Sequence, residues 1–138
     1  MDKQRYGDLD NENPLKPFAA LTISDTTPHV SNSIDLRRYD RVSFQLITTG
    51  TLDGAWKVEI SNNVVNSGSG AYGQVAATGT WTDITSGFSP AIASVDHTNA
   101  ATQSQYAQAD IRIRAIRVTF TGTAGTGAVS VYINATEI

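Results

Sequence analysis

The sequence predicts an all-β fold: an antiparallel two-sheet sandwich of the jelly-roll type with an extended N-terminal arm. Apolar and polar residues alternate over about seven or eight short segments, as they do in half-buried strands. Clusters of Gly, Asp, Thr and Pro separate these segments, and no stretch shows the apolar period of a helix. Short strands joined by turns favour two packed antiparallel sheets.

The chain length fits one domain that needs no covalent cross-links. It has 138 residues and no cysteine, and a domain of about this size buries roughly 68–70% of its unfolded surface. We find no apolar run of transmembrane length and no apolar signal-peptide core at the N-terminus. We therefore expect a polar arm over residues 1–17, one sandwich domain over residues 18–138, and synthesis in the cytoplasm.

Charge is scarce and unevenly distributed. The net charge of −3 argues against nucleic acid as a partner. Residues 60–82 and 97–109 contain no Asp, Glu, Lys or Arg. Because apolar residues are interleaved in both stretches, we favour loops that pack against neighbouring subunits over solvated linkers.

The N-terminal region begins with an extended segment. Pro14 and Pro17 favour extended backbone and prevent a helix. Two interpretations stay open for this arm, a frayed terminus and an extension that reaches a neighbouring subunit. Residues 18–23 then form the first expected strand, and residues 25–28 have the composition of a turn.

Two hairpins are expected further along the chain. In the first, an alternating segment at residues 42–47 is joined by a Gly- and Asp-containing turn to a second at residues 56–60. In the other, residues 116–120 and 129–133 alternate in the same way on either side of a turn with three glycines. The second hairpin closes the domain.

The region between these hairpins is less regular. Residues 79–84 predict a short strand, and residues 88–95 another that Pro90 confines to an edge. Residues 96–108 alternate weakly and are expected to form a loop. Residues 110–120 read as one strand with a bulge near Arg114 and Ala115, because the apolar phase changes there.

The order and spacing of several motifs resemble a group of small bacteriophage virion proteins. Those proteins combine a V-S-F-Q-L strand, a G-T-W/F strand ending in S-N, a G-T-W-T strand and a closing I-R-L-x-Y-T hairpin with S-G-T-G. The matching stretches here lie at residues 35–36, 39, 42–46, 50–51, 54, 56, 58–62, 79–82 and 116–127. The match covers roughly residues 35–138, and this chain departs from the pattern at residues 62–79 and 96–109.

The resemblance implies a β-sandwich exposed on a virion or built into it. We expect a capsid decoration or cement protein, a homotrimer whose partners are its own copies and the major capsid protein or other virion proteins. Nucleic acid and membranes are not expected partners. The alternative is a carbohydrate- or receptor-binding module, such as a spike or fibre head with a glycan as its partner. Both functions would be performed on a virion.

The sequence contains no pattern that indicates catalysis. A serine hydrolase needs a base and an orienting acid on one side, but Asp96 and His97 are neighbours and point to opposite faces of an extended chain. His29 follows a proline in a turn, and no serine lies in a nucleophile-elbow motif. Residues 8–12 lack the glycine and spacing of an EF-hand loop. We therefore expect no enzyme, cofactor or metal.

The expected functional surface is an interface. Arg112, Arg114 and Arg117 recur along the strand at residues 110–120, and guanidinium groups pair well with carboxylates of a neighbouring subunit. Asp35, Asp40 and the acidic arm are the available partners. The complete set of expected interface residues is Arg112, Arg114, Arg117, Asp35, Asp40, Tyr72, Tyr106, Pro14, Pro17 and Phe18.

Aromatic residues divide into two expected groups. Trp56 and Trp81 fall on the inward phase of strands, and we expect them in the core. Tyr72 and Tyr106, in the uncharged loops, and Tyr132, on an outward phase, are the candidates for stacking on a sugar ring.

Overall fold

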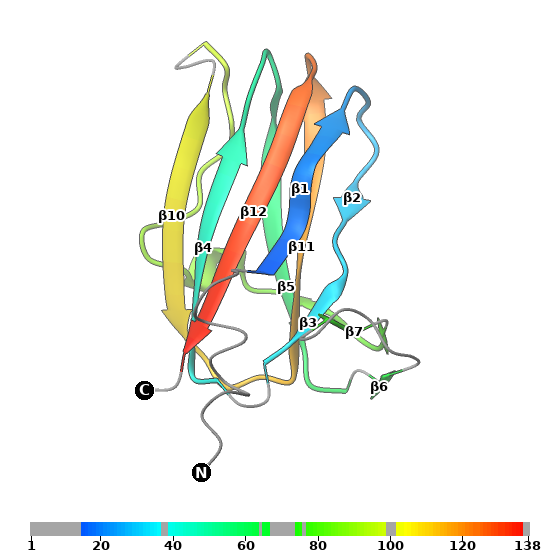
Figure 1. The fold of residues 1–138 in the computed structure, drawn as a ribbon, viewed down its shortest axis with the longest axis vertical. Coiled ribbons are helices and arrows are strands. Elements are labelled where there is room, and N and C mark those ends of the chain that lie inside the picture. Colours follow the sequence, from blue (N-terminus) through cyan, green and yellow to red (C-terminus); the bar gives the residue numbers. More distant parts are fainter. Residues whose placement is uncertain are drawn as a thin grey trace.

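The computed structural model describes residues 15–36, 39–63, 65–66, 74–75, 77–98 and 102–136. It confirms the all-β prediction: two antiparallel sheets face each other as a sandwich (Figure 1). The described part of the chain contains no helix with the length and apolar character that a membrane crossing requires.

Sheet A has four strands in the order β1, β12, β4 and β10. They span Leu15–Ile23, Gly127–Thr136, Arg41–Thr48 and Gln103–Asp110. Sheet B has the order β7, β3, β11, β5 and β9, and β2 also pairs with β11. Its strands span Gln74–Val75, Ser33–Asp35, Ala115–Ala124, Asp53–Ser61, Thr82–Asp83 and His29–Val30. A separate pair is formed by β6 (Val65–Asn66) and β8 (Ala77–Thr78), and a 3₁₀ turn, η1, spans Thr85–Gly87.

The core lies between the sheets and consists of the apolar phase of each long strand. Val42, Phe44 and Leu46 of β4 are buried, as are Trp56 and Val58 of β5. The Trp56 ring packs against Phe120 with ring centroids 4.8 Å apart and an interplanar angle of 68°. The prediction that Trp56 belongs to the core is therefore confirmed.

Both expected hairpins are wrong in their pairing. The strands themselves are present, but β4 lies in sheet A and β5 in sheet B, and β11 and β12 are likewise in different sheets. Each connection therefore crosses the sandwich, at residues 49–52 (the first crossing) and residues 125–126 (the second crossing). Alternation shows that a strand has one buried face, and it contains no information about which strand pairs with its edge.

The two crossings hydrogen-bond to each other. The Thr49 backbone N–H donates to the Ala128 carbonyl (3.0 Å), and the Thr51 N–H donates to the Thr126 carbonyl (2.9 Å). In return the Ala128 N–H donates to Thr49 Oγ1 (3.2 Å). In a tight hairpin these backbone N–H and carbonyl groups would bond to each other within the turn. Here they bond to groups of the other connection.

Residues 96–108 are not a loop throughout, because β10 begins at Gln103 and pairs with β4 along its whole length. Its inward positions hold small or polar residues, including Gln105 and Ala107, which explains the weak alternation. The Gln105 amide bonds to both backbone groups of Ala93, donating to the carbonyl (2.9 Å) and accepting from the N–H (2.8 Å). Hydrogen bonds there replace the apolar contacts that a sequence pattern detects.

Residues 110–120 are not one bulged strand. β10 ends at Asp110 in sheet A, residues 111–114 cross between the sheets, and β11 begins at Ala115 in sheet B. Residues 88–95 form only isolated bridges, Ser89 with Gln108 and Val95 with Gly54.

The first strand begins at Leu15, within the expected arm. Two register shifts interrupt its pairing with β12, one on each side of Phe18. The Phe18 ring is buried and lies 6.4 Å from Trp56. Bulges and Pro17 suit an edge strand, because they hinder pairing with a further strand.

We predict that Gly127→Ala lowers the free energy of unfolding by about 2–3 kcal/mol. A Cβ atom there would overlap the Thr49 carbonyl oxygen, which belongs to the first crossing. Gly87→Ala is the matched control, since a Cβ at Gly87 meets nothing within 4 Å. Urea denaturation should show a change within about 0.5 kcal/mol for the control. Equal stability of the two variants would contradict the tight packing of the crossings.

Candidate functional site

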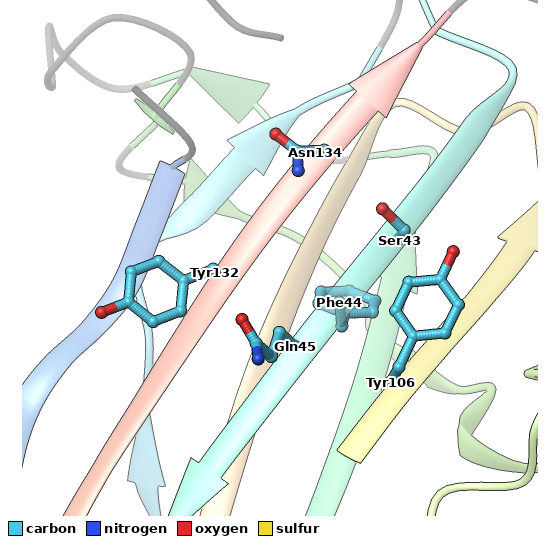
Figure 2. A pocket seen from close by; sticks show the side chains of 6 residues that line it. All are labelled: Ser43, Phe44, Gln45, Tyr106, Tyr132 and Asn134. Atoms are coloured by element: carbon cyan, nitrogen blue, oxygen red, sulfur yellow. The ribbon is translucent and has the colours of Figure 1, made fainter. Parts of the chain in front are cut away.

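A row of three side chains crosses the outer face of sheet A. In the strand registers Tyr106 of β10 lies opposite Gln45 of β4, and Gln45 lies opposite Tyr132 of β12. Since Phe44 and Leu46 point into the core, Gln45 points outward, and its two partners share that face. Figure 2 shows the two tyrosine rings on either side of the Gln45 amide.

This row lines a hollow of about 440 Å³. Its lining residues are Ser43, Phe44, Gln45, Tyr106, Tyr132 and Asn134, and none carries a formal charge at neutral pH. The Phe44 ring itself is buried in the core. Tyr106 is 54% exposed, and Tyr132 is half-buried. The face thus combines aromatic rings with amides and a hydroxyl, the mixture typical of small-ligand sites.

Neighbouring side chains hold the row in place. The Tyr106 hydroxyl donates to Gln108 Oε1 (2.6 Å), and Gln45 Nε2 donates to Ser104 Oγ (3.2 Å). Lys16 Nζ of β1 lies 5.5 Å from the centre of the Tyr132 ring, within cation–π range. The outward position of Tyr132 confirms its predicted phase, whereas Tyr106 lies on a strand and not in the expected loop.

The three arginines that were expected along one strand do not lie on a single strand. Arg112 and Arg114 lie in the segment that crosses between the sheets, and Arg117 lies on β11. Arg112 Nε pairs with Asp40 Oδ1 of the same chain at 2.8 Å. The Arg114 backbone N–H donates to Asn62 Oδ1 (2.9 Å). Arg112 and Arg117 therefore have carboxylate partners within the chain, and their role in an interface stays a prediction.

Arg117 belongs to a small cluster on the outer face of sheet B. Its Nε donates to Glu59 Oε1 (2.9 Å), and its guanidinium carbon lies 4.3 Å from the centre of the Trp81 ring. The Glu59 side chain is only 11% exposed. The expectation that Trp81 lies in the core is wrong: the ring is half-buried and packs against Arg117 instead. Trp81 lies just before β9, which spans only Thr82–Asp83, so the ring does not take the inward phase that the alternation suggested.

The other expected interface residues are dispersed. Asp35 lies on β3 opposite Ala115, and Asp40 precedes β4. Pro17 and Phe18 belong to β1, where Phe18 is a core residue. Pro14 and Tyr72 lie outside the described residues.

A cluster of Asp53, Asp96 and His97, not predicted from the sequence, lies beside the start of β5. Their ligand-type atoms all lie within 4.8 Å of one another. Asp53 Oδ1 accepts from the His97 backbone N–H (2.9 Å) and lies 2.7 Å from His97 Nδ1. These contacts hold the pKa of Asp53 below its ordinary value, the backbone bond being the larger cause.

Asp96 is occupied in the same way. The Thr98 hydroxyl, followed by its backbone N–H, lowers the pKa of Asp96. Asp53 and Asp96 therefore fasten the segment that follows Val95. Asp96 and His97 are adjacent in the sequence, and the bridge between Gly54 and Val95 brings Asp53 to them, a contact that no local sequence pattern indicates.

The chain has no match among family models or curated proteins.

We predict that Arg117→Ala lowers the free energy of unfolding by about 1–3 kcal/mol, because the nearly buried Glu59 side chain loses its hydrogen-bond donor and ion-pair partner. Lys57 Nζ, 3.6 Å from Glu59 Oε2, offsets only part of the loss. Arg112→Ala is the control, since its side chain is 84% exposed and exposed ion pairs contribute little. Chemical denaturation measures both, and a larger loss for Arg112→Ala would contradict this assignment.

We predict that the protein loses stability in acid and that Asp53→Asn reduces this pH dependence. The pKa of Asp53 is lower in the folded than in the unfolded chain. Its stabilising effect is therefore complete above the unfolded pKa of about 4 and disappears as the pH falls through the folded value. Thermal melting between about pH 7 and pH 2 should show a flatter profile for the variant. Parallel profiles would contradict the prediction.

Proposed function

We propose that this protein is a non-enzymatic structural component of a bacteriophage virion, most concretely a capsid decoration or cement protein. The observation that carries the proposal is where the resembling motifs fall. The V-S-F-Q-L stretch lies on β4, the stretch that contains Trp56 lies on β5, and the closing I-R-V-T-F stretch lies on β11. These strands form the centre of the sandwich, so the resemblance concerns the framework of the fold.

The strand order supports a jelly roll as part of this proposal. The antiparallel pairs β1 with β12, β3 with β11, β4 with β10 and β5 with β9 succeed one another along the chain. They alternate strictly between the two sheets, the first and third pairs lying in sheet A and the second and fourth in sheet B. A long antiparallel ribbon wound around a core produces this order.

The proposed mechanism is stabilisation by mass action. A protein that binds the assembled shell and not the dissociated subunits stabilises the shell by its binding free energy. A homotrimer would present the charge-poor segments and the N-terminal arm to its own copies and to the shell. This mechanism requires no catalytic residues.

A glycan- or receptor-binding head is the second candidate, and the tyrosine-lined hollow on sheet A favours it. Tyr106 lies within residues 96–109, where this chain departs from the resembling proteins. The framework resembles that of structural proteins, whereas the outer face differs from them. This combination is compatible with either function.

The proposal predicts that the protein occupies defined sites on a purified phage particle. Electron microscopy of particles decorated with a labelled antibody against the chain locates it. If it is a decoration protein, adding it to shells that lack it should raise the melting temperature of the shell. Absence from the particle would overturn the proposal.

Mass photometry of the purified protein provides the companion measurement. We expect a particle of three times the 14.7 kDa chain mass. Arg112→Glu should reduce that mass if the exposed arginine contacts a neighbouring copy, whereas Lys57→Glu on the outer face of sheet B serves as the matched control. If the protein is a monomer that still binds shells, the proposed location on the virion stands and the proposed homotrimer is wrong.

A further inference from the structure

We propose that the outer face of sheet A binds a neutral oligosaccharide, which stacks sugar rings on Tyr106 and Tyr132 and hydrogen-bonds to the polar groups between them. Such binding gives the hollow a defined residue set and a ligand class. It applies to the protein on a virion or elsewhere, so it does not depend on the decoration role.

The two rings have the spacing and exposure of a stacking platform. They are separated by β4, so their strands lie two strand spacings apart, roughly 9–10 Å. That distance suits successive or alternate rings of a short sugar chain that crosses the strands. Both rings are seen in face view from outside the sheet in Figure 2, so their faces are turned toward an incoming ligand. Pyranose rings offer C–H groups that pack on such faces.

Polar groups between the rings match sugar hydroxyls. Gln45 and Asn134 each carry an amide that both donates and accepts, and Ser43 carries a hydroxyl that does the same. The side chains of Ser43 and Asn134 make no hydrogen bond to any of the described residues. Sugar hydroxyls are likewise both donors and acceptors, so a saccharide can pair with these side chains without leaving a polar atom unsatisfied.

The absence of charged lining residues favours a neutral sugar. No lining residue is charged, so nothing inside it would compensate a carboxylate or phosphate during desolvation. Arg41, at the end of this face, is engaged by Asp110: its Nε donates to Asp110 Oδ1 at 2.6 Å. Lys16 lies beside the Tyr132 ring, at the rim of the platform.

The face is a poor match for a stable protein partner. Among the described residues, the large apolar side chains that are exposed are Val30 and Tyr106. They belong to different sheets, Val30 to β2 of sheet B and Tyr106 to β10 of sheet A, and do not form one patch. Stable protein interfaces bury about 800 Å² on each partner around an apolar centre. A small polar ligand suits this surface better.

The strand that carries Tyr106 is held on both sides. β4 pairs with β10 along one edge. On the other edge Ser89 and Gln108 exchange two backbone hydrogen bonds (3.0 and 2.9 Å), and Gln105 binds the backbone of Ala93. A platform fixed in this way loses little conformational entropy on binding, which increases the affinity that a few contacts can produce.

Titration of the full chain with defined sugars tests the proposal. The probes are cellotriose, maltotriose and the trimer of N-acetylglucosamine, with trigalacturonic acid as the acidic comparison. Two-dimensional ¹⁵N NMR should show shifts of Tyr106, Tyr132 and the side-chain amides of Gln45 and Asn134 with at least one neutral probe. No shift with any neutral probe at millimolar concentration, or preference for the acidic trimer, would overturn the proposal.

Variants separate stacking from other effects. Tyr106→Ala and Tyr132→Ala should each weaken binding about tenfold or more, because each removes one stacking surface. Tyr106→Phe keeps the ring and should stay within about threefold of the parent affinity. Lys57→Ala, on the opposite sheet, is the control and should bind as the parent does. Unchanged binding by the double alanine variant would overturn the assignment.

Mass photometry of the same variants tests whether a second copy of the chain, and not a sugar, covers this face. If the double alanine variant loses subunits while sugar titrations show no shift, a second copy of the chain covers this face and the proposal is wrong. Retained oligomeric mass with lost sugar binding supports it. Because the platform can fail while the protein still binds shells, the two proposals fail independently.

Discussion

The hydrogen bonds between the two crossings are the constraint on which the sandwich depends. Residues 49–52 and 125–126 each carry the chain from one sheet to the other, and at these points it leaves the pairing of one sheet before entering that of the next. The Thr49 and Thr51 N–H groups donate to the carbonyls of Ala128 and Thr126, so the first crossing is hydrogen-bonded to the second crossing and to the start of β12. The close approach requires glycine at position 127. Four long strands, β4, β5, β11 and β12, are placed by this single junction.

The same arrangement leaves the outer face of sheet A available for binding. Core residues of β4 and β12 occupy the inward phase, which sends Gln45 and Tyr132 outward. The edge strand β10 adds Tyr106 to their row, and residues 89–95 cover its outer edge. The proposed binding surface is thus built on the most regular part of the fold, where strand pairing fixes the positions of the side chains.

Sheet B has a different outer surface. Arg117 lies between Glu59 and the Trp81 ring, so charge there is paired and partly covered. Arg112 is exposed but paired with Asp40. The two outer faces therefore differ in chemistry: one offers uncharged aromatic and amide groups, and the other uses its arginine to stabilise the fold. This contrast is why the binding proposal concerns sheet A.

The sequence by itself determined the all-β class, the central residues of β4, β5, β11 and β12, and the inward phase of Val42, Phe44, Trp56 and Phe120, because a period of two reports directly on one buried face. Tertiary structure decided which strands pair. It turned both expected hairpins into crossings, split residues 110–120 between two sheets and revealed β10, whose inward glutamines bond to backbone instead of packing. The tyrosine row and the contact of Asp53 with His97 belong to the same category. Their residues are far apart along the chain, and only the hydrogen-bonded register, which local alternation does not encode, brings them together.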